Sequence, residues 1–208
     1  FKPDIRRSAL IGLLLGLMLS FALAFLLERL DETIKTPEDI ERQLRLPVLG
    51  IVPKVGEGSL EAMSEDTRSP FSEAYRSLRT GLQYATEAGA PRILLVTSAV
   101  AGEGKSTTAL MLARKFAQLG VKVLLIDADM RRPKIAKLIG RDPKLPGLAD
   151  LVAGEVQISQ CVFHHEKAGI YVLPAGTIPP NPLELISSRR FNDVVAKIQQ
   201  QEPIKAAS

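Results

Sequence analysis

A long apolar run opens the sequence and is followed by alternating apolar and polar stretches. Residues 8–27 are twenty consecutive residues without a charged side chain, bounded by Arg6–Arg7 and Glu28–Arg29. As an α-helix they would extend about 30 Å, the thickness of the hydrocarbon core of a bilayer. The run is longer than the apolar part of a secretory signal peptide, and a buried core helix is rarely apolar on all sides. The pattern therefore predicts a transmembrane helix over 8–27.

Shorter elements are predicted between this run and residue 90. Thr36–Asp39 is typical of a helix start, with Thr as N-cap, Pro in the first position and acids in the first turn, and this helix is expected to reach Leu46. A short strand is predicted at 48–52, and the polar residues 53–69 indicate a linker. A second helix is predicted over 70–88, because four apolar residues recur there at helical spacing: Phe71, Tyr75, Leu78 and Leu82.

Strands and helices alternate from Arg92 onward, which is typical of a doubly wound α/β domain. Apolar runs predict parallel strands covered on both faces, and the segments between them predict helices. The last helix has Asn as its cap and Pro in its first position. The expected elements are strands at 93–96, 121–126 and 170–173, a helix over 106–119 ended by Gly120, and a helix that begins at Asn181.

A glycine-rich segment between the first of these strands and the helix predicts a phosphate-binding loop. Ala99–Ser106 matches the pattern G-x-x-x-x-G-K-[ST] except at Ala99, which replaces the first glycine. Backbone amides at the start of a helix can converge on phosphate oxygens. We expect Lys105 to reach the β- and γ-phosphates of ATP and Ser106 to ligate Mg²⁺. The nucleotide-binding residues are predicted to be Gly102, Glu103, Gly104, Lys105, Ser106 and Thr107. The context of strand and helix argues against a glycine-rich turn without function.

Two carboxylates follow the next predicted strand. Asp127 and Asp129 lie where ligands bind in open α/β sheets, and Arg131 and Arg132 come directly after them. Such a set suits metal binding, base catalysis and charge neutralisation during phosphoryl transfer. An Asp after a strand is often only a turn residue, but the loop one strand earlier favours a functional pair. We therefore predict Lys105, Asp127 and Asp129 as catalytic residues, and Ser106, Asp127 and Asp129 as metal ligands.

The composition excludes some other functions. The formal net charge is +4, aromatic residues make up 5% of the chain and Trp is absent, so no stacking platform for nucleic acid is predicted. Cys161 is the single cysteine, which excludes an intrachain disulfide. His164 and His165 have only Glu166 nearby as a further ligand, and this favours a surface loop over a metal site.

With these motifs the chain resembles the bacterial tyrosine autokinases of capsule and exopolysaccharide export, a family of P-loop ATPases. Ile126–Arg131 matches the family's second acidic motif, h-h-h-D-x-D-x-R, and Glu73, Arg76 and Arg79 match its E-x-x-R-x-x-R motif. The apolar run, with Leu30–Ile34 and Leu46–Gly50, resembles the last membrane helix and exit of a chain-length-determinant domain. Further similar segments are Gly147–Leu151, Pro174–Gly176 and Pro180–Pro182.

The resemblance implies a mostly parallel P-loop NTPase sheet flanked by helices, with ATP and Mg²⁺ as cofactors. It implies that Asp127 supports Mg²⁺ and acts as base toward a tyrosine hydroxyl, while Asp129 assists the metal. It also implies a ring-like homo-oligomer through Glu73, Arg76 and Arg79, phosphorylation between subunits, and partners in the membrane and the polysaccharide export machinery. Nucleic acid is not an expected partner.

ATP is cytoplasmic, so the C-terminal side of the span is expected inside a bacterial inner membrane. The predicted organisation is an extracytoplasmic stub (1–7), a transmembrane helix (8–27), a juxtamembrane linker (28–69) and a kinase domain (70–208). Because the sequence opens on Phe1, a fragment is expected. The family's further strand ending in Asp and its tyrosine-rich tail are not recognised after the last predicted helix, so a C-terminally incomplete domain is expected. Tyr75, Tyr84 and Tyr171 are expected to be structural.

Three other functions are considered. A truncated membrane scaffold or chain-length regulator that binds nucleotide without phosphate transfer agrees with the unrecognised strand and tail. A partition-type membrane ATPase is disfavoured, because Val100 stands where that class carries an additional lysine. A transporter ATPase is disfavoured because no ABC-type signature is recognised.

Overall fold

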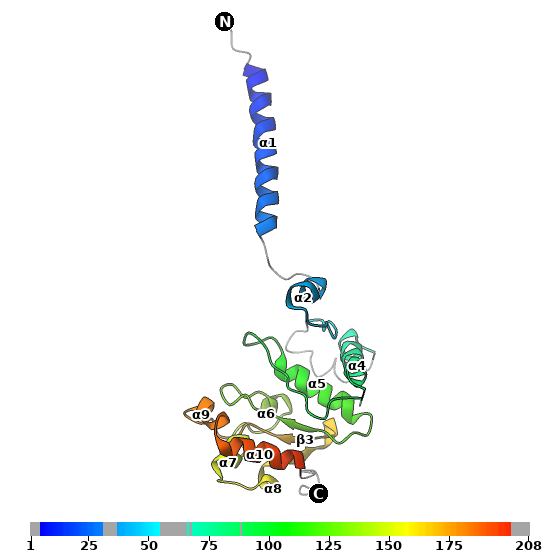
Figure 1. The fold of residues 1–208 in the computed structure, drawn as a ribbon, viewed down its shortest axis with the longest axis vertical. Coiled ribbons are helices and arrows are strands. Elements are labelled where there is room, and N and C mark those ends of the chain that lie inside the picture. Colours follow the sequence, from blue (N-terminus) through cyan, green and yellow to red (C-terminus); the bar gives the residue numbers. More distant parts are fainter. Residues whose placement is uncertain (1–4, 31–36, 55–65, 67, 88, 201–208) are drawn as a thin grey trace. The chain divides into compact units, whose positions relative to one another are not determined.

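The computed structural model describes residues 5–30, 37–54, 66, 68–87 and 89–200 of the 208-residue chain. The chain separates into two compact units, Phe1–Val48 and Leu49–Ser208. The first unit contains helix α1 (Ile5–Leu30) and helix α2 (Pro37–Leu44), and the second contains the sheet and the remaining helices (Figure 1). The polar linker predicted at 53–69 falls largely on residues outside the described part.

Helix α1 contains the apolar run. Its window Ala9–Leu27 has a mean hydropathy of 2.7, and none of that window is buried within the structure. By length and composition this helix could cross a bilayer. The predicted helical run over 8–27 is therefore confirmed as an apolar helix of sufficient length.

Helix α2 begins at Pro37 and carries Glu38 and Asp39 in its first turn, as expected. It ends at Leu44, two residues before the predicted end, because Arg45 has a φ of 54°, which no helix accommodates. The predicted cap Thr36 lies outside the described residues. The strand predicted at 48–52 is wrong: the Val48 amide donates to Glu41 Oε1 over 3.3 Å, and Val52 packs against helices rather than pairing with a strand.

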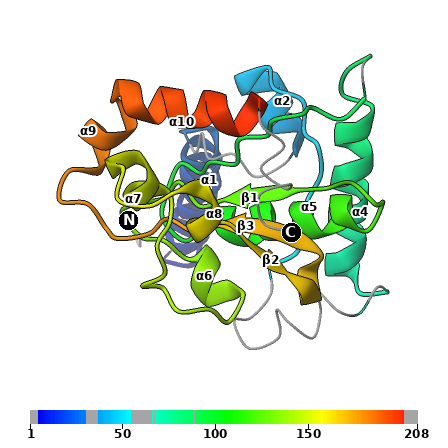
Figure 2. The ribbon, with the colours of Figure 1, turned by 90° about the horizontal axis from the view of Figure 1, so that it is seen from below.

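The second unit contains a three-stranded sheet with strand order β1-β3-β2. Strand β1 (Leu124–Ile126) pairs parallel to β3 (Ile170–Leu173), with Leu125 opposite Val172. Strand β2 (Phe163–His165) pairs antiparallel to β3 (Figure 2). The prediction for β3 is confirmed. Strand β1 is shorter than predicted because pairing begins only at Val123, whose carbonyl accepts the Tyr171 amide over 2.9 Å. The surface loop predicted at His164 and His165 is wrong, because both lie in β2.

Helices cover both faces of this sheet, as the doubly wound prediction requires. Leu125, Ile170 and Val172 face one core, which also contains residues of α5 (Lys105–Ala117) and α6 (Ile135–Leu138). The residues that alternate with them, including Leu173, face a second core. That second core is formed with α7 (Leu148–Ala153), α8 (Ile158–Cys161), α9 (Pro182–Ile186) and α10 (Arg189–Gln200). The α/β fold class is confirmed.

Helix α4 (Pro70–Gln83) packs against α5 through a third core (Figure 2). Ser69 caps α4, since its Oγ accepts the Ser72 amide over 3.1 Å. The predicted apolar stripe is buried there against Met111 and Leu112 of α5. The helix ends five residues before the predicted residue 88, because the Ala85 amide donates to Leu82 O in a tighter i+3 bond of 3.3 Å.

The helix predicted from Asn181 is two helices, α9 and α10. Ser188 begins the second, since its Oγ accepts the Phe191 amide over 3.1 Å and so caps a new helix. Pro182 occupies the first position of α9 as expected, whereas the Asn181 side chain bonds Glu184 Oε2 rather than the backbone. A single turn of 3₁₀ helix, η2 (Glu166–Ala168), joins β2 to β3.

Residues 93–96, which precede the glycine-rich loop, do not form the predicted strand. Ile93 lies in a bend and residues 94–96 have no regular secondary structure, and in the described part of the chain no backbone hydrogen bond joins them to a neighbour. Ile93 is 65% exposed and Leu95 is 83% exposed. Strand β1 is paired on one edge only, by β3, among the described residues. An apolar run becomes a strand only where another strand supplies its ladder partners, and none does so here.

Candidate nucleotide-binding site

The glycine-rich loop leads directly into helix α5. Gly104 is the N-cap residue with a φ of 86°, and Gly102 has a φ of 95°. Both lie in the left-handed region that glycine adopts without steric cost. The first helical bond follows at once, from the Thr108 amide to Gly104 O over 2.8 Å. The amides before it have no partner within the helix and carry the positive end of the helix dipole, so this terminus suits a phosphate group.

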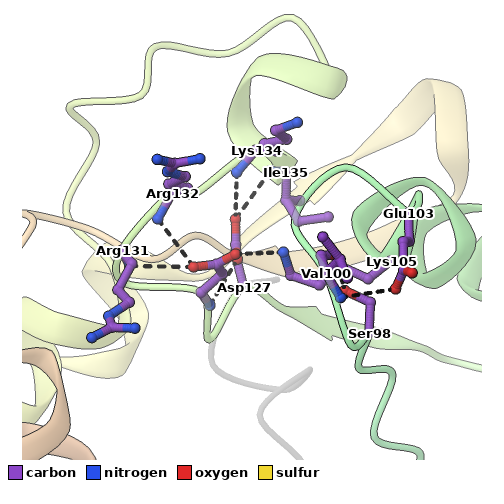
Figure 3. Close-up of polar contacts among 10 residues, drawn as sticks. Ser98, Val100, Glu103, Lys105, Asp127, Arg131, Arg132, Lys134 and Ile135 are labelled. Atoms are coloured by element: carbon purple, nitrogen blue, oxygen red, sulfur yellow. Dashed lines mark hydrogen bonds and ion pairs between the residues drawn. The ribbon is translucent and has the colours of Figure 1, made fainter.

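Two side chains brace the loop from within. Glu103 Oε2 accepts the Val100 amide over 3.1 Å, and Ser98 Oγ donates to Val100 O over 3.0 Å (Figure 3). Both polar groups of the Val100 backbone are therefore held by the loop itself. The sequence predicted Glu103 as a nucleotide-binding residue and gave no role to Ser98. The structure places the Glu103 carboxylate against the loop backbone.

Asp127 lies at the carboxyl end of β1, where its amide donates to Leu173 O over 2.9 Å. Its carboxylate is 5% exposed and accepts three backbone amides: Asp129 at Oδ1 over 3.1 Å, and Lys134 and Ile135 at Oδ2 over 3.1 and 3.0 Å (Figure 3). Burial raises the pKa of this carboxyl, and the amide hydrogen bonds oppose that rise only in part. Asp127 therefore organises the turn into α6 and retains a raised proton affinity.

Asp129 joins the acidic segment to the glycine-rich loop. Its Oδ2 lies 2.6 Å from Lys105 Nζ, and both side chains are largely shielded from solvent. Burial favours the neutral acid, but the Lys105 ammonium and the amides of Arg132 and Arg131 outweigh it and lower the pKa of Asp129. The structure thus brings together Lys105 and Asp129, residues that the sequence predicted to lie close to each other.

The backbone after Asp129 wraps around the same carboxylate. Asp129 Oδ1 accepts the amides of Arg131 and Arg132 over 3.3 and 3.0 Å, and the side chains of both arginines are exposed (Figure 3). The arginines therefore fix the turn through their backbone and leave their guanidinium groups at its outer rim.

The residues at this site fit Mg²⁺ only together with phosphate oxygens. In the described ranges no group of three or more His, Cys, Asp or Glu side chains is arranged to hold a metal ion. Mg²⁺ in phosphoryl-transfer sites is usually held by one or two carboxylates, a hydroxyl and the phosphates themselves. The predicted ligands Ser106, Asp127 and Asp129 supply a hydroxyl and two carboxylates at the start of α5 and the end of β1.

The residues predicted to contact another subunit all lie on α4, away from the glycine-rich loop in sequence. Arg76 Nη1 forms an ion pair with Glu73 Oε2 over 2.9 Å, and both side chains are exposed. The Nε atom of Arg79 is buried and has no hydrogen-bond partner among the described residues. The sequence did not predict two polar links from α4 to α5, Tyr75 to Thr108 and Ser72 to Lys115, which lie within the helix interface.

The chain matches known proteins over most of this unit. Residues 94–206 match a family described as the CobQ/CobB/MinD/ParA nucleotide binding domain. The chain is 42% identical over 133 residues to tyrosine-protein kinase YwqD of Bacillus subtilis (strain 168), covering 64% of this chain and 55% of that one. It is 37% identical over 124 residues to tyrosine-protein kinase wzc of Salmonella typhi, covering 60% of this chain and 17% of that one.

A similar fold occurs in the kinase domain of Escherichia coli tyrosine kinase ETK, with a TM-score of 0.72 and 28% sequence identity. That match covers 81% of this chain and 70% of the solved domain. The resemblance to bacterial tyrosine kinases that the sequence indicated is therefore confirmed. The chain spans about half of the Bacillus subtilis relative and a smaller share of the Salmonella typhi relative.

Proposed function

We propose, because this chain belongs to the family of CobQ/CobB/MinD/ParA nucleotide-binding domains, that it binds ATP with Mg²⁺ at Ala99–Thr107 and phosphorylates protein tyrosine. One observation carries the proposal: the 2.6 Å ion pair between Lys105 and Asp129 joins the glycine-rich loop to the acidic segment. A phosphate-binding lysine and a carboxylate pair at one place are the two components that phosphoryl transfer requires. The names of the similar kinases support tyrosine as the acceptor.

Each side chain then has a role that follows from its surroundings. The amides from Gly102 to Thr107 and the Lys105 ammonium bind the phosphates, and Ser106 and Asp129 are candidates for holding Mg²⁺. When bound, Mg²⁺ would supply positive charge to the transferring group. Asp127, whose pKa is raised by burial, is suited to support the metal and to take the proton from the attacking tyrosine hydroxyl. The tyrosine oxygen bonds the γ-phosphorus as the bond to ADP breaks.

We place this activity at the cytoplasmic face of a bacterial inner membrane, with α1 as the anchor and residues 1–7 outside. ATP is available on one side only, so the unit that starts at Leu49 faces the cytoplasm. Self-association through Glu73, Arg76 and Arg79 would let one subunit phosphorylate another. The exposed Glu73–Arg76 pair supports that contact, as does Arg79, whose Nε has no hydrogen-bond partner among the described residues. The process that the resemblance implies is polymerisation and export of exopolysaccharide or capsule.

The test is incubation of the chain, in membranes or detergent, with ATP and Mg²⁺, followed by detection of phosphotyrosine on the chain and on an added tyrosine-rich peptide. Lys105→Met should abolish the signal, whereas Lys122→Met, at an exposed lysine before β1, should leave it unchanged. A signal that persists in Lys105→Met would contradict the assignment of the site.

A second candidate function is a membrane scaffold that binds nucleotide without transferring phosphate. Residues 93–96 favour it, because this segment leads into the loop and pairs with no strand in the part of the chain that the structure describes. Nucleotide binding by the wild-type chain without any phosphotyrosine, even on the added peptide, would support the scaffold over the kinase.

A further inference from the structure

A buried tyrosine on α4 contacts the helix that begins with the glycine-rich loop. The Tyr75 side chain is 2% exposed, and its hydroxyl oxygen lies 3.1 Å from Oγ1 of Thr108. The Tyr75 ring stacks edge-on against Phe71, with ring centroids 5.0 Å apart. Helix α4 lies beside α5 (Figure 2). Of the two polar links between these helices, this pair is the one nearer to the loop.

Thr108 lies in the first turn of α5, so a contact that restrains its side chain also restrains the end of the loop. Its backbone amide donates to Gly104 O over 2.8 Å and so closes the first turn of α5. It follows directly after Ser106 and Thr107, which the sequence predicts to contact nucleotide and metal. Displacement of Thr108 therefore displaces the turn whose free amides face the phosphates.

The hydrogen bond is required by Tyr75 more than by Thr108. A tyrosine hydroxyl buried among apolar side chains must be satisfied, since an unpaired buried polar group costs stability. A helical threonine has a second option, because its hydroxyl can bond a carbonyl one turn earlier. Burial raises the pKa of Tyr75, so the hydroxyl stays protonated at neutral pH and can donate.

The other polar link between the helices lies at the opposite end of α5. Lys115 Nζ donates to Ser72 Oγ over 2.7 Å, near the carboxyl end of α5. Ser72 and Lys115 therefore fix the end of α5 far from the loop, while Tyr75 fixes the end next to it. Variants of the two links can therefore be compared: one link stabilises the packing of α5, and the other also restrains the loop.

We propose that Tyr75 is a positioning residue of the nucleotide site, which holds the first turn of α5 through Thr108 and so sets the placement of the phosphate-binding amides. The inference deepens the proposed function and rests on it for the nature of the ligand. Because α4 also carries Glu73, Arg76 and Arg79, the same hydroxyl pair connects the proposed subunit-contact helix to the phosphate-binding loop.

The test measures binding of a fluorescent ADP analogue with Mg²⁺ to the full chain in detergent, well below the unfolding temperature. Tyr75→Phe keeps the ring and deletes only the hydroxyl, and we expect the Kd to rise about five-fold, the effect of one neutral hydrogen bond. Thr108→Val removes the same bond from the partner side. It keeps the inference testable if Tyr75→Phe does not fold.

A double-mutant cycle separates positioning from general destabilisation. If the bond is the cause, Tyr75→Phe/Thr108→Val should bind the analogue no more weakly than the weaker single variant. Additive losses, with the two fold-changes multiplied in the double variant, would contradict the inference, because the two hydroxyls would then act independently.

Two controls complete the experiment. Tyr84→Phe deletes a hydroxyl from a tyrosine that is 83% exposed at the end of the same helix, and should change neither Kd nor Tm. Ser72→Ala should lower Tm but leave the Kd unchanged. A Tyr75→Phe variant that loses Tm and keeps the wild-type Kd would overturn this inference alone. Failure of the wild-type chain to bind the analogue would overturn the ATP site and this inference together.

Discussion

Asp127 and Asp129 are two residues apart, yet their surroundings shift their pKa values in opposite directions. Burial dominates at Asp127 and raises its pKa, whereas at Asp129 the Lys105 ammonium outweighs burial and lowers it. Two carboxyl groups with separated pKa values are a frequent arrangement where one group accepts a proton and the other stays ionised. The difference arises because Asp127 is the more deeply buried, while Asp129 is stabilised as the anion by Lys105 and by the amides of Arg132 and Arg131.

The lowered pKa of Asp129 predicts a pH-dependent contribution to stability. The unfolded chain binds the proton more readily, so the contribution is present above the unfolded pKa of about 3.9 and is lost as pH falls through the lower folded pKa. Asp129→Asn should therefore lower the unfolding free energy by about 1 kcal/mol at pH 7 and by less at pH 3. Urea unfolding in detergent across pH 3–7 measures this, and a constant difference over that range would contradict it.

The space around two glycines predicts how much stability each would lose if it were replaced by alanine. Gly176 has a φ of 83°, and a Cβ there would meet the Asp150 carboxylate and the Gly147 backbone. Gly140 has a similar φ of 69° but open space around it. Gly140→Ala should cost about 1 kcal/mol from backbone strain, and Gly176→Ala about 2 to 4 kcal/mol because a clash is added. Chemical denaturation measures both; equal losses would show that the loop after β3 yields without cost.

The sequence predicted some residue-scale features and not others, for a physical reason. The left-handed Gly102 and Gly104 follow from the loop pattern, and Asp129 near Lys105 follows from their places after neighbouring predicted strands. The Glu103–Val100 and Tyr75–Thr108 bonds were not predictable. Each depends on how a loop or a helix packs, which the spacing of residues along the chain does not encode.

At the scale of elements, the interface of α4 and α5 contains a buried cation that, among the described residues, has a hydroxyl and no carboxylate as its hydrogen-bond partner. Lys115 is 2% exposed and donates to Ser72 Oγ. Burial is the first cause of its lowered pKa, and the positive charges of Arg76, Arg114 and Arg79 add to it. The interface therefore carries an electrostatic cost that its apolar core offsets.

The lowered pKa of Lys115 predicts how the difference in unfolding free energy between the wild-type chain and Lys115→Met changes with pH. The folded pKa lies below the unfolded value, so the unfolded chain binds more protons between the two, and wild-type stability rises with pH in that window below about 10.4. Met removes the titrating group and keeps a side chain of similar length. Relative to Lys115→Met, the wild-type chain should gain unfolding free energy in urea as the pH rises from 7 to 9.5, because its folded pKa is the lower one. A difference that does not change over this interval would indicate that the ammonium is not shifted in the folded chain.

Helices α1, α2, α4 and α5 and strand β3 were predicted from local sequence signals, whereas the short helices α6, α7 and α8 were not. The wrong predictions at 48–52 and 93–96 have the same cause: both are apolar runs, but no neighbouring strand pairs with them among the described residues. Strand β2 was not predicted because His164 and His165 are polar and give no apolar run. The strand forms through its pairing with β3, which is a tertiary contact. Strands depend on distant partners in a way that helices do not.

At the scale of the whole molecule, the apolar α1 predicts how the chain partitions. Two arginines near the centre of the span, Leu15→Arg/Leu19→Arg, should oppose insertion by about 5 to 7 kcal/mol, comparable to the favourable contribution of the run itself. The variant should leave the membrane pellet after an alkaline wash, while the wild-type chain stays in it. Leu44→Arg/Leu46→Arg, at exposed leucines outside the span, is the matched control. Retention of the α1 variant in the pellet would show that another part of the chain binds the membrane.

The sequence also predicted the broad order of the molecule, an apolar helix followed by an α/β unit, because composition changes sharply between them. The structure places the start of the second unit at Leu49, since Val52 already packs against the α4–α5 core. The apolar run at 48–52 indicates burial but does not indicate the helices against which Val52 packs.

Helix α5 contributes residues to two of the three cores, one against the sheet and one against α4. A ligand held at the first turn of α5 therefore resists unfolding of both by mass action. At a free concentration one hundred times its Kd, such a ligand adds about 2.7 kcal/mol to the unfolding free energy. The proposed nucleotide would therefore protect both cores of the chain against proteolysis.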